Sequence, residues 1–248
     1  PIPPELIYGA DESGFQSGVG TRERVIGRQG KKVQHQQRSG GRENMTVLVT
    51  ICADGTSLAP AVIFKGMGYQ TSWKQENPLN AFLGYQKKGY IDGEIGVEWI
   101  KQFDAQTREK ATGRRRLLLV DGHNSHFTLG FIRYSRENKI EVVCYPSHST
   151  HLYQGLDVVI FSILKRCWSE ARDMFERQRR GKVNKTNFLK IYAEAHVKTL
   201  TPENIHAAFQ KTGIVPFNPA VITEEMMAPS LTWSIEEPLP FPMEEPTK

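Results

Sequence analysis

Short apolar runs, several of them rich in β-branched residues, alternate with longer amphipathic stretches along most of the 248 residues. Turn-forming or polar residues bound the short runs, which predicts strands that are buried or lie at a sheet edge. They cover residues 5–10, 45–52, 58–64, 117–120 and 140–145. Asp54-Gly55 predicts a hairpin between the second and third strands. Glycine and serine after Asp11 predict that the first strand gives way to a turn there, and residues 66–92 read as loop with room for one short strand.

The longer stretches space their apolar residues three and four positions apart, which predicts helices. They cover residues 97–110, 128–138, 157–179, 185–199 and 202–211. Three hairpin-like strands followed by alternating strands and helices predict an α/β fold, with a mixed sheet flanked by helices. The C-terminal end is rich in proline and glutamate, which predicts disorder. We therefore expect one domain over residues 1–222 and a disordered tail over residues 223–248.

Composition and charge narrow the class of protein. The net charge of +5 is compatible with a polyanionic partner, although each basic cluster alone is explained as well by a solvated face. No apolar run approaches the roughly 18 residues of a membrane span, so we expect no membrane partner. The three cysteines form no CxxC pair, which indicates reduced thiols in an intracellular protein. The chain does not begin with methionine, so we expect it to be part of a longer protein.

Three aspartates fall at or just beyond the ends of predicted strands. Asp11 and Asp121 each follow a strand directly, and Asp157 opens a helix after a third strand and a short loop. Strand ends of an open α/β sheet are where active sites collect, so we expect these side chains to meet. Clustered carboxylates repel one another, and a divalent cation such as Mg²⁺ or Mn²⁺ removes that conflict. Each acid alone is explained as well by a helix cap or a turn, so the functional interpretation depends on all three.

Asp157 also shares a helical spacing with the apolar residues that follow it. The residues on that face are Phe161, Leu164, Trp168, Ala171 and Phe175. Because this face must pack on the sheet, the spacing predicts that Asp157 points inward. An inward carboxylate is costly unless another group pairs with it, which again favours a bound cation.

Two segments, LLLVDGHNSH and CYPSHSTHLYQGLDVVIFSILKRCW, resemble the DDE-superfamily endonuclease domain of pogo-type transposases, within the wider mariner group. ADESGF around Asp11, the strand pair TVLVTICADGTSLAPAVIFKG and the late IHAAFQKTGIVPFNP are similar to the same family. Asp157 lies 36 positions after Asp121, within that family's usual range. The chain departs from the family pattern at Gly155, where proline usually stands, and at Gly9 and Ala10, which replace a common Asn-Met.

The resemblance implies a ribonuclease-H-like fold and a nuclear enzyme that cleaves and joins strands of double-stranded DNA, at transposon ends and at a target. It implies that Asp11, Asp121 and Asp157 are the catalytic residues and the ligands of two Mg²⁺ (or Mn²⁺) ions. The reaction would be an in-line displacement at phosphorus. The resemblance also implies a helix-turn-helix DNA-binding region that is not in this chain, and a homodimer.

Two HxxH pairs, His123 with His126 and His148 with His151, lie near the predicted site in the sequence. Zinc is one interpretation, because histidine is a common zinc ligand. The pairs fall on predicted loops, and the acids already supply hard-metal ligands, so we favour a supporting role. His123, His126 and His151 are then expected to orient the carboxylates by hydrogen bonds.

Basic residues before the central strand and along the long helix are candidate phosphate contacts, which give affinity for DNA without sequence choice. They are Arg114, Arg115, Arg116, Lys165, Arg166 and Arg172.

Three functions remain open from the sequence. An active transposase nuclease is favoured by the three retained acids. A host protein derived from a transposase, which binds DNA without cutting it, is the alternative. A metal hydrolase of small phosphorylated substrates is weaker, because it would give no reason for basic surface clusters.

Overall fold

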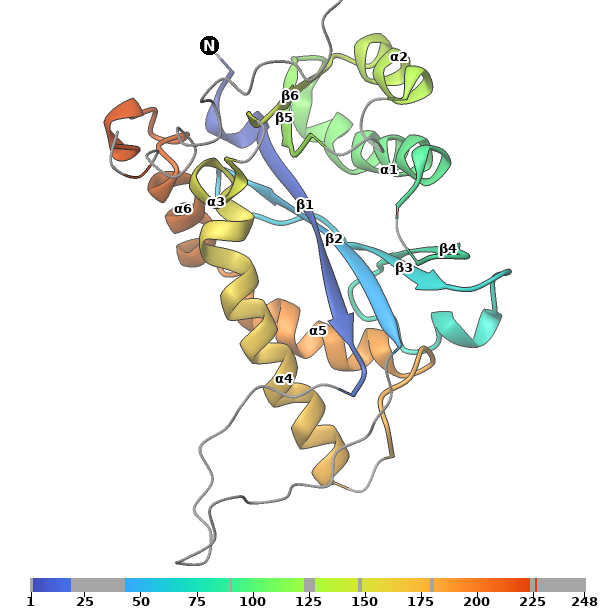
Figure 1. Ribbon diagram of the computed structural model, residues 1–248. Coiled ribbons are helices and arrows are strands. Elements are labelled where there is room, and N and C mark those ends of the chain that lie inside the picture. Colours follow the sequence, from blue (N-terminus) through green and yellow to red (C-terminus); the bar gives the residue numbers. More distant parts are fainter. Residues whose placement is uncertain are drawn as a thin grey trace, which may run out of the picture.

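The computed structural model describes residues 2–18, 43–89, 91–122, 128–146, 149–178, 181–223 and 226. Within them, one six-stranded sheet is covered by helices on both faces (Figure 1). The predicted class, a mixed sheet flanked by helices, is therefore confirmed. The tail over residues 223–248, predicted to be disordered, lies outside the described residues except for Thr223 and Met226.

The sheet has the strand order β4-β3-β2-β1-β5-β6. The strands are β1 (Ile7–Gln16), β2 (Asn44–Cys52), β3 (Ala61–Lys65), β4 (Phe82–Gln86), β5 (Arg116–Val120) and β6 (Ile140–Cys144). The first three strands pair antiparallel, as the hairpin signals predict. β5 then joins the other side of β1 in parallel, and β6 joins β5 in parallel. The parallel strands place their carboxyl ends at one edge of the sheet, where a site is expected.

β1 is longer than the sequence predicts. It continues through Asp11 to Gln16 and stays paired with β2 from Tyr8↔Cys52 to Gln16↔Asn44. The predicted turn after Asp11 is therefore wrong over residues 12–16. Phe15, at 1% exposure, packs into the core beyond the sheet, and this burial together with the β2 ladder outweighs the turn preference of glycine and serine. As a result Asp11 lies within a strand.

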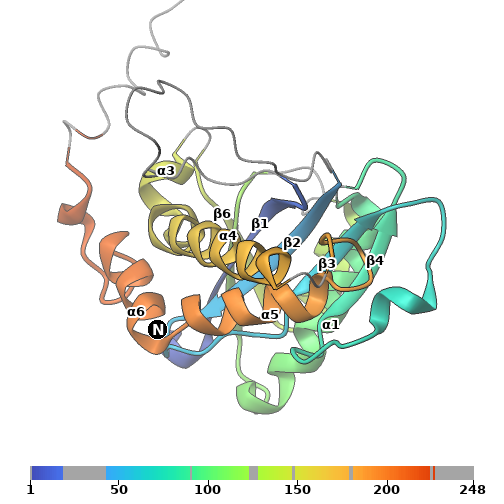
Figure 2. The same ribbon diagram turned by 90° about the horizontal axis from the view of Figure 1, so that it is seen from below.

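Two helical layers enclose the sheet (Figure 2). The helices are α1 (Gly93–Ala111), α2 (Leu129–Glu137), α3 (Thr150–Tyr153), the π-helical turn η4 (Leu156–Ile160), α4 (Phe161–Arg177), α5 (Phe188–Thr199), α6 (Pro202–Lys211) and the short 3₁₀ turns η1 (Pro4–Leu6), η2 (Thr71–Lys74) and η5 (Pro219–Val221). The five predicted helices are thus present, with small changes at their ends. In the described part of the chain, no helix is both long and apolar enough to cross a membrane.

Each face of the sheet has its own hydrophobic core. α1 and α2 cover one face, where Tyr8, Ala10 and Val120 belong to the same core as Trp99 and Phe131. α4, α5 and α6 cover the other face, where β1 contributes Phe15. Because side chains alternate along a strand, the odd-numbered positions of β1 face the α4 layer. Asp11 therefore belongs to the α4 side of the sheet.

A buried ion pair attaches the start of β5 to α1. Arg116 Nη1 lies 2.7 Å from Asp104 Oδ1, and the two side chains are only 4% and 0% exposed. Arg116 also donates to Thr107 Oγ1 at 2.9 Å, and the Tyr134 hydroxyl donates to Asp104 at 3.0 Å. Burial alone would raise the pKa of Asp104, but the hydrogen bonds from Arg108, Arg116 and Tyr134 lower it. This cluster is structural, because it is enclosed between β5, α1 and α2.

His196 makes the fold sensitive to acid. Its ring is 5% exposed, Nδ1 lies 3.2 Å from the Tyr192 hydroxyl, and burial lowers the pKa of His196 to about 4. Below its ordinary pKa near 6.5 the unfolded chain binds a proton that the folded chain does not, so stability falls as the pH falls from about 6.5 towards about 4. Moving from about pH 7.5 to about pH 5 should cost roughly 2 kcal/mol through this group.

The measurement is urea unfolding of the wild type and of His196→Gln at both pH values. The wild type should lose about 2 kcal/mol more than the variant over this interval. All other titrating groups are common to the two proteins and cancel in the difference. Equal losses in the two proteins would contradict the prediction.

Candidate active site

The parallel pairing of β1 with β5 brings Asp11 and Asp121 together. The register pairs Ile7 with Leu117, Tyr8 with Leu118 and Gly9 with Leu119. Two positions further along the same register, Asp11 is level with Asp121, which follows the last residue of β5. Neighbouring strands lie about 4.8 Å apart, and both residues have the strand parity that faces the α4 layer. The sequence prediction that these two acids meet at one sheet edge therefore agrees with the strand register.

Asp157 reaches the same region from the helical layer. β6 is followed by α3 and then by η4, which contacts β1 (Figure 1). Asp157 lies in η4, immediately before α4. All three acids therefore lie where β1, the end of β5 and the start of the α4 layer converge.

The predicted inward orientation of Asp157 is wrong, because the residue is exposed. In η4 the N–H of Phe161 donates to the carbonyl of Leu156, five residues back, instead of four. The wider turn places Leu156, at 1% exposure, in the core with Phe161 and rotates Asp157 away from it. Such π-turns are frequent at functional sites. Here the turn gives the carboxylate access to solvent and to any ligand at the sheet edge.

The charges of the three acids act on one another. The pKa of Asp11 is raised well above its usual value by burial, then by the charge of Asp157, with a smaller contribution from Asp121. The backbone N–H of Glu12 opposes this effect, donating to Asp11 Oδ1 at 2.7 Å. The pKa of Asp157 is raised by partial burial and by the charge of Asp121, whereas Thr150 and Lys165 lower it. Each acid is therefore within electrostatic range of the others.

A fourth acid, Glu12, follows Asp11 in β1 with its side chain on the opposite face of the strand, and it was not among the site residues predicted from the sequence. Burial, followed by the charge of Asp121, raises the pKa of Glu12 to about 7. The predicted turn after Asp11 concealed Glu12, because a turn would have exposed it to solvent. Its signal was available: a second acid directly follows Asp11.

The donor set suits a hard divalent cation, because carboxylate oxygens are the ligands that Mg²⁺ and Mn²⁺ prefer. Burial and mutual repulsion disfavour the charged forms of Asp11 and Asp157, and a cation would relieve both effects. Among the residues that the structure describes, no group of three or more histidine, cysteine or acidic side chains is gathered closely enough to hold a metal ion. The acids are thus neighbours with suitable chemistry that are not drawn together as a ligand cluster.

Of the predicted supporting histidines, His123 and His126 lie outside the described residues. His151 is exposed on α3. It adjoins Thr150, whose side chain forms a hydrogen bond with Asp157. Its role in orienting a carboxylate stays a prediction.

Two of the predicted DNA contacts are wrong. Arg116 is 3% exposed and belongs to the buried cluster with Asp104. Arg172 is 2% exposed and pairs with Asp173 at 2.6 Å. A buried guanidinium that already has a carboxylate partner is not available to a DNA phosphate, because its removal from that partner would leave an unpaired buried charge.

The other basic residues differ in where they lie. Arg114 and Arg115 are exposed but precede β5, whereas Asp121 follows it, so the length of the strand separates them from the acids. They pair with Glu5 and Glu141.

Lys165 and Arg166 are exposed on α4, a little more than two turns beyond Asp157. The charge of Lys165 lowers the pKa of Asp157, so this ammonium lies within electrostatic range of that acid. Lys165 is therefore the strongest of the six as a phosphate contact.

Gly155 allows η4 to pack closely on α6. A Cβ at this position would lie 2.7 Å from the carbonyl oxygen of Ala208, which is backbone and cannot move independently. Gly155→Ala should therefore destabilise the fold by roughly 1–3 kcal/mol, as overpacking does. Gly68→Ala is the matched control, since a Cβ there would meet nothing within 4 Å. Urea unfolding should separate the two variants, and equal stability would show that α6 does not restrain this turn.

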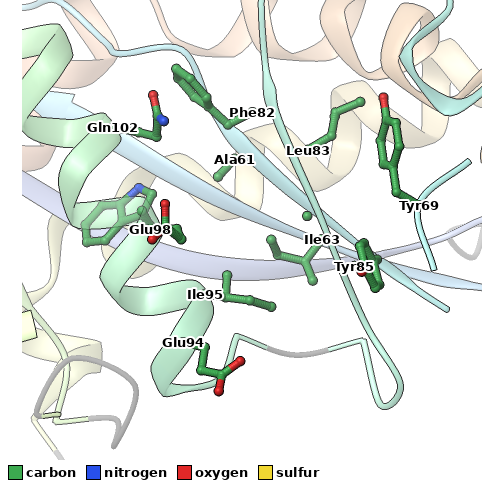
Figure 3. A pocket seen from close by; sticks show the side chains of 12 residues that line it. Ala61, Ile63, Tyr69, Phe82, Leu83, Tyr85, Glu94, Ile95, Glu98 and Gln102 are labelled. Carbon is green, nitrogen blue, oxygen red and sulfur yellow. The ribbon is translucent and has the colours of Figure 1, made fainter. Parts of the chain in front are cut away.

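A separate groove lies elsewhere. It has a volume of about 600 Å³ and runs between α1 and the β3–β4 edge (Figure 3). Ile63, Phe82 and Trp99 contribute apolar surface, and Glu94 and Glu98 line the α1 side. None of the three aspartates lines this groove, so it is separate from the candidate site.

Comparison with known proteins shows the family to which this chain belongs. A family model described as DDE superfamily endonuclease matches residues 42–209, which include Asp121 and Asp157 but not Asp11. A relative from Cochliobolus lunatus, described as an MFS-type transporter clz9, is 33% identical over 230 residues. That match covers 92% of this chain and 25% of the relative, so the chain spans a quarter of its length.

Three solved structures share the fold. A Mos1 strand transfer complex has a TM-score of 0.56 at 12% identity, over 84% of this chain and 52% of that one. A Mos1 mariner paired-end complex with Mn has a TM-score of 0.55 at 10% identity, over 87% and 56%. The Mos1 transposase catalytic domain with raltegravir and Mn has a TM-score of 0.51 at 11% identity, over 88% and 82%. These likenesses confirm the predicted ribonuclease-H-like fold.

Proposed function

The chain belongs to the DDE superfamily endonuclease family, and on that premise we propose that it is the catalytic core of a transposase, which cleaves and joins DNA strands with the help of divalent metal ions. One observation carries the proposal: three acids far apart in the sequence converge where β1, β5 and η4 meet, and the charges of Asp157 and Asp121 raise the pKa of Asp11. Acids kept under mutual repulsion at the end of parallel strands suit a cation site better than a structural role.

Asp11, Asp121 and Asp157 are the proposed holders of two Mg²⁺ or Mn²⁺ ions. When bound, such ions polarise a phosphodiester and lower the pKa of a bound water. The chain itself contributes by holding the three carboxylates in position. β1 and β5 fix Asp11 and Asp121 on the sheet, and η4 presents Asp157 to solvent. Lys165, exposed beside Asp157, is positioned to attract a DNA phosphate.

The titles of the structural neighbours name a strand transfer complex and paired-end complexes. By analogy we propose that the partners of this chain are double-stranded DNA, both transposon ends and target, and a second copy of the chain. Action on chromosomal DNA would place the protein in the nucleus.

The test is nicking of a supercoiled plasmid by the purified chain with Mg²⁺, with Mn²⁺ and with EDTA. We expect nicking with either metal and none with EDTA. DNA binding in a mobility-shift assay without nicking under any metal would instead favour the alternative, a transposase-derived protein that binds DNA without cutting it. If the chain neither binds nor nicks DNA, the proposal is overturned. Binding should also weaken steeply with salt, because phosphate contacts release counterions.

A further inference from the structure

Gln154 has a buried amide with no hydrogen-bond partner among the described residues. The residue is 1% exposed, and neither Oε1 nor Nε2 forms a hydrogen bond of good geometry. Burying such a group unpaired costs about 1–3 kcal/mol, so an unpaired buried amide calls for an explanation.

The backbone around Gln154 fixes where the amide lies. Its N–H donates to the Thr150 carbonyl at 2.9 Å, and its carbonyl accepts from Val158 at 3.0 Å. The next residue, Gly155, packs against the backbone of Ala208 in α6. The side chain of Gln154 is therefore held between α6 and the sheet by contacts on both sides of it in the sequence.

The amide is directed towards Asp11. Gln154 and Gly9 line the same small cavity, and Gly9 lies two positions before Asp11 on the same face of β1. The Gln154 side chain lowers the pKa of Asp11, so the amide lies near this carboxylate, although its geometry falls short of a hydrogen bond. Glu12 N–H donates to Asp11 Oδ1 at 2.7 Å, so a second donor beside this carboxylate would fix its orientation from another side.

We infer that Gln154 is a positioning residue for Asp11: its amide Nε2–H orients the carboxylate so that a remaining lone pair of its oxygens faces a divalent cation. The inference rests on the proposed function, because it gives Asp11 the role of a metal ligand. It adds a residue that lies three positions before Asp157, so one segment of chain supplies one acid and orients another. The amide is costly to the fold alone and useful once Asp11 holds a cation.

The test is Mn²⁺ binding to the purified chain, followed by the electron paramagnetic resonance signal of free Mn²⁺, with thermal unfolding of the metal-free protein in parallel. Gln154→Leu should weaken Mn²⁺ binding roughly ten-fold, as loss of a ligand-orienting group does. The same variant should leave the metal-free Tm unchanged or higher, because it removes an unpaired buried amide. Gln102→Leu, which alters a partly buried amide on the α1 side, is the matched control and should change neither quantity.

The outcomes separate this inference from the function on which it rests. Mn²⁺ binding that is lost in Asp11→Asn but unchanged in Gln154→Leu would overturn the role of Gln154 alone. A lower metal-free Tm in Gln154→Leu with an unchanged Mn²⁺ affinity would show a merely structural role and also overturn it. Absence of Mn²⁺ binding by the wild type would overturn both the role of Gln154 and the proposed metal-dependent function. Mn²⁺ binding that depends on Gln154, without plasmid nicking, would support the inference and reject the nuclease.

Discussion

Asp157→Asn is expected to lower the rate of metal-dependent plasmid nicking roughly a thousand-fold, the loss that corresponds to several kcal/mol of metal-ion catalysis. The amide keeps the size of the side chain and removes the charge that a cation requires. Because Asp157 is exposed on η4 and makes no core contact that the charge supports, the variant should fold normally. Removing one of three repelling carboxylates should also raise the stability of the metal-free protein slightly.

The matched control is Glu170→Gln, which removes an exposed acid from the same helical segment, further along α4. It should nick at the wild-type rate. Quantifying nicked and supercoiled plasmid over time gives both rates, and thermal unfolding confirms that the two variants are folded. An Asp157→Asn protein that nicks as fast as the wild type with Mg²⁺ would reject Asp157 as part of the active site.

Asp104→Asn should be the most destabilising of the substitutions considered, by roughly 3–5 kcal/mol. It leaves the guanidinium of Arg116, at 3% exposure, without its charged partner, and water cannot replace that partner in the space between β5 and α1. Urea unfolding measures the loss. The double variant Asp104→Leu with Arg116→Met should recover much of it, because apolar side chains of similar size need no partner.

Arg115→Gln supplies the comparison from the same strand end. Arg115 and Glu141 form an ion pair with side chains 71% and 45% exposed, and such pairs contribute less than about 1 kcal/mol. Its loss should therefore be within roughly 1 kcal/mol of the wild type. Similar losses for Asp104→Asn and Arg115→Gln would contradict the view that burial decides the importance of these charges.

Much of the fold follows from the apolar runs. Five of the six strands and all five longer helices lie where hydrophobic spacing predicts them, because burial on one or both sides of a sheet leaves a direct mark in the sequence. The part of β1 beyond Asp11 was not predicted as strand, because its glycine and serine favour turns. In the fold, pairing with β2 and the burial of Phe15 outweigh that preference. The same error concealed Glu12.

The orientation of Asp157 could not be predicted, because nothing in side-chain spacing signals a hydrogen bond that spans five residues instead of four. The arginines are a different case. A charge count says nothing about burial, yet Arg172 has the helical spacing of the buried face, four positions after Trp168 and three before Phe175. That spacing was a usable sign of a buried side chain. Arg116 gave a weaker sign, as the residue that leads directly into an apolar strand.

The register between β1 and β5 makes the separation of Asp11 and Asp121 independent of how much chain connects them. The pairing of Ile7–Gly9 with Leu117–Leu119 fixes this register two positions before the acids, so insertions in the intervening loops would lengthen the polypeptide without moving either carboxylate. Asp157 is not fixed by strand pairing. Its position depends on the short segment that runs from β6 through α3. For this architecture, the interval between the first two acids is a poor guide in comparing sequences, and the 36-residue interval before the third is a good one.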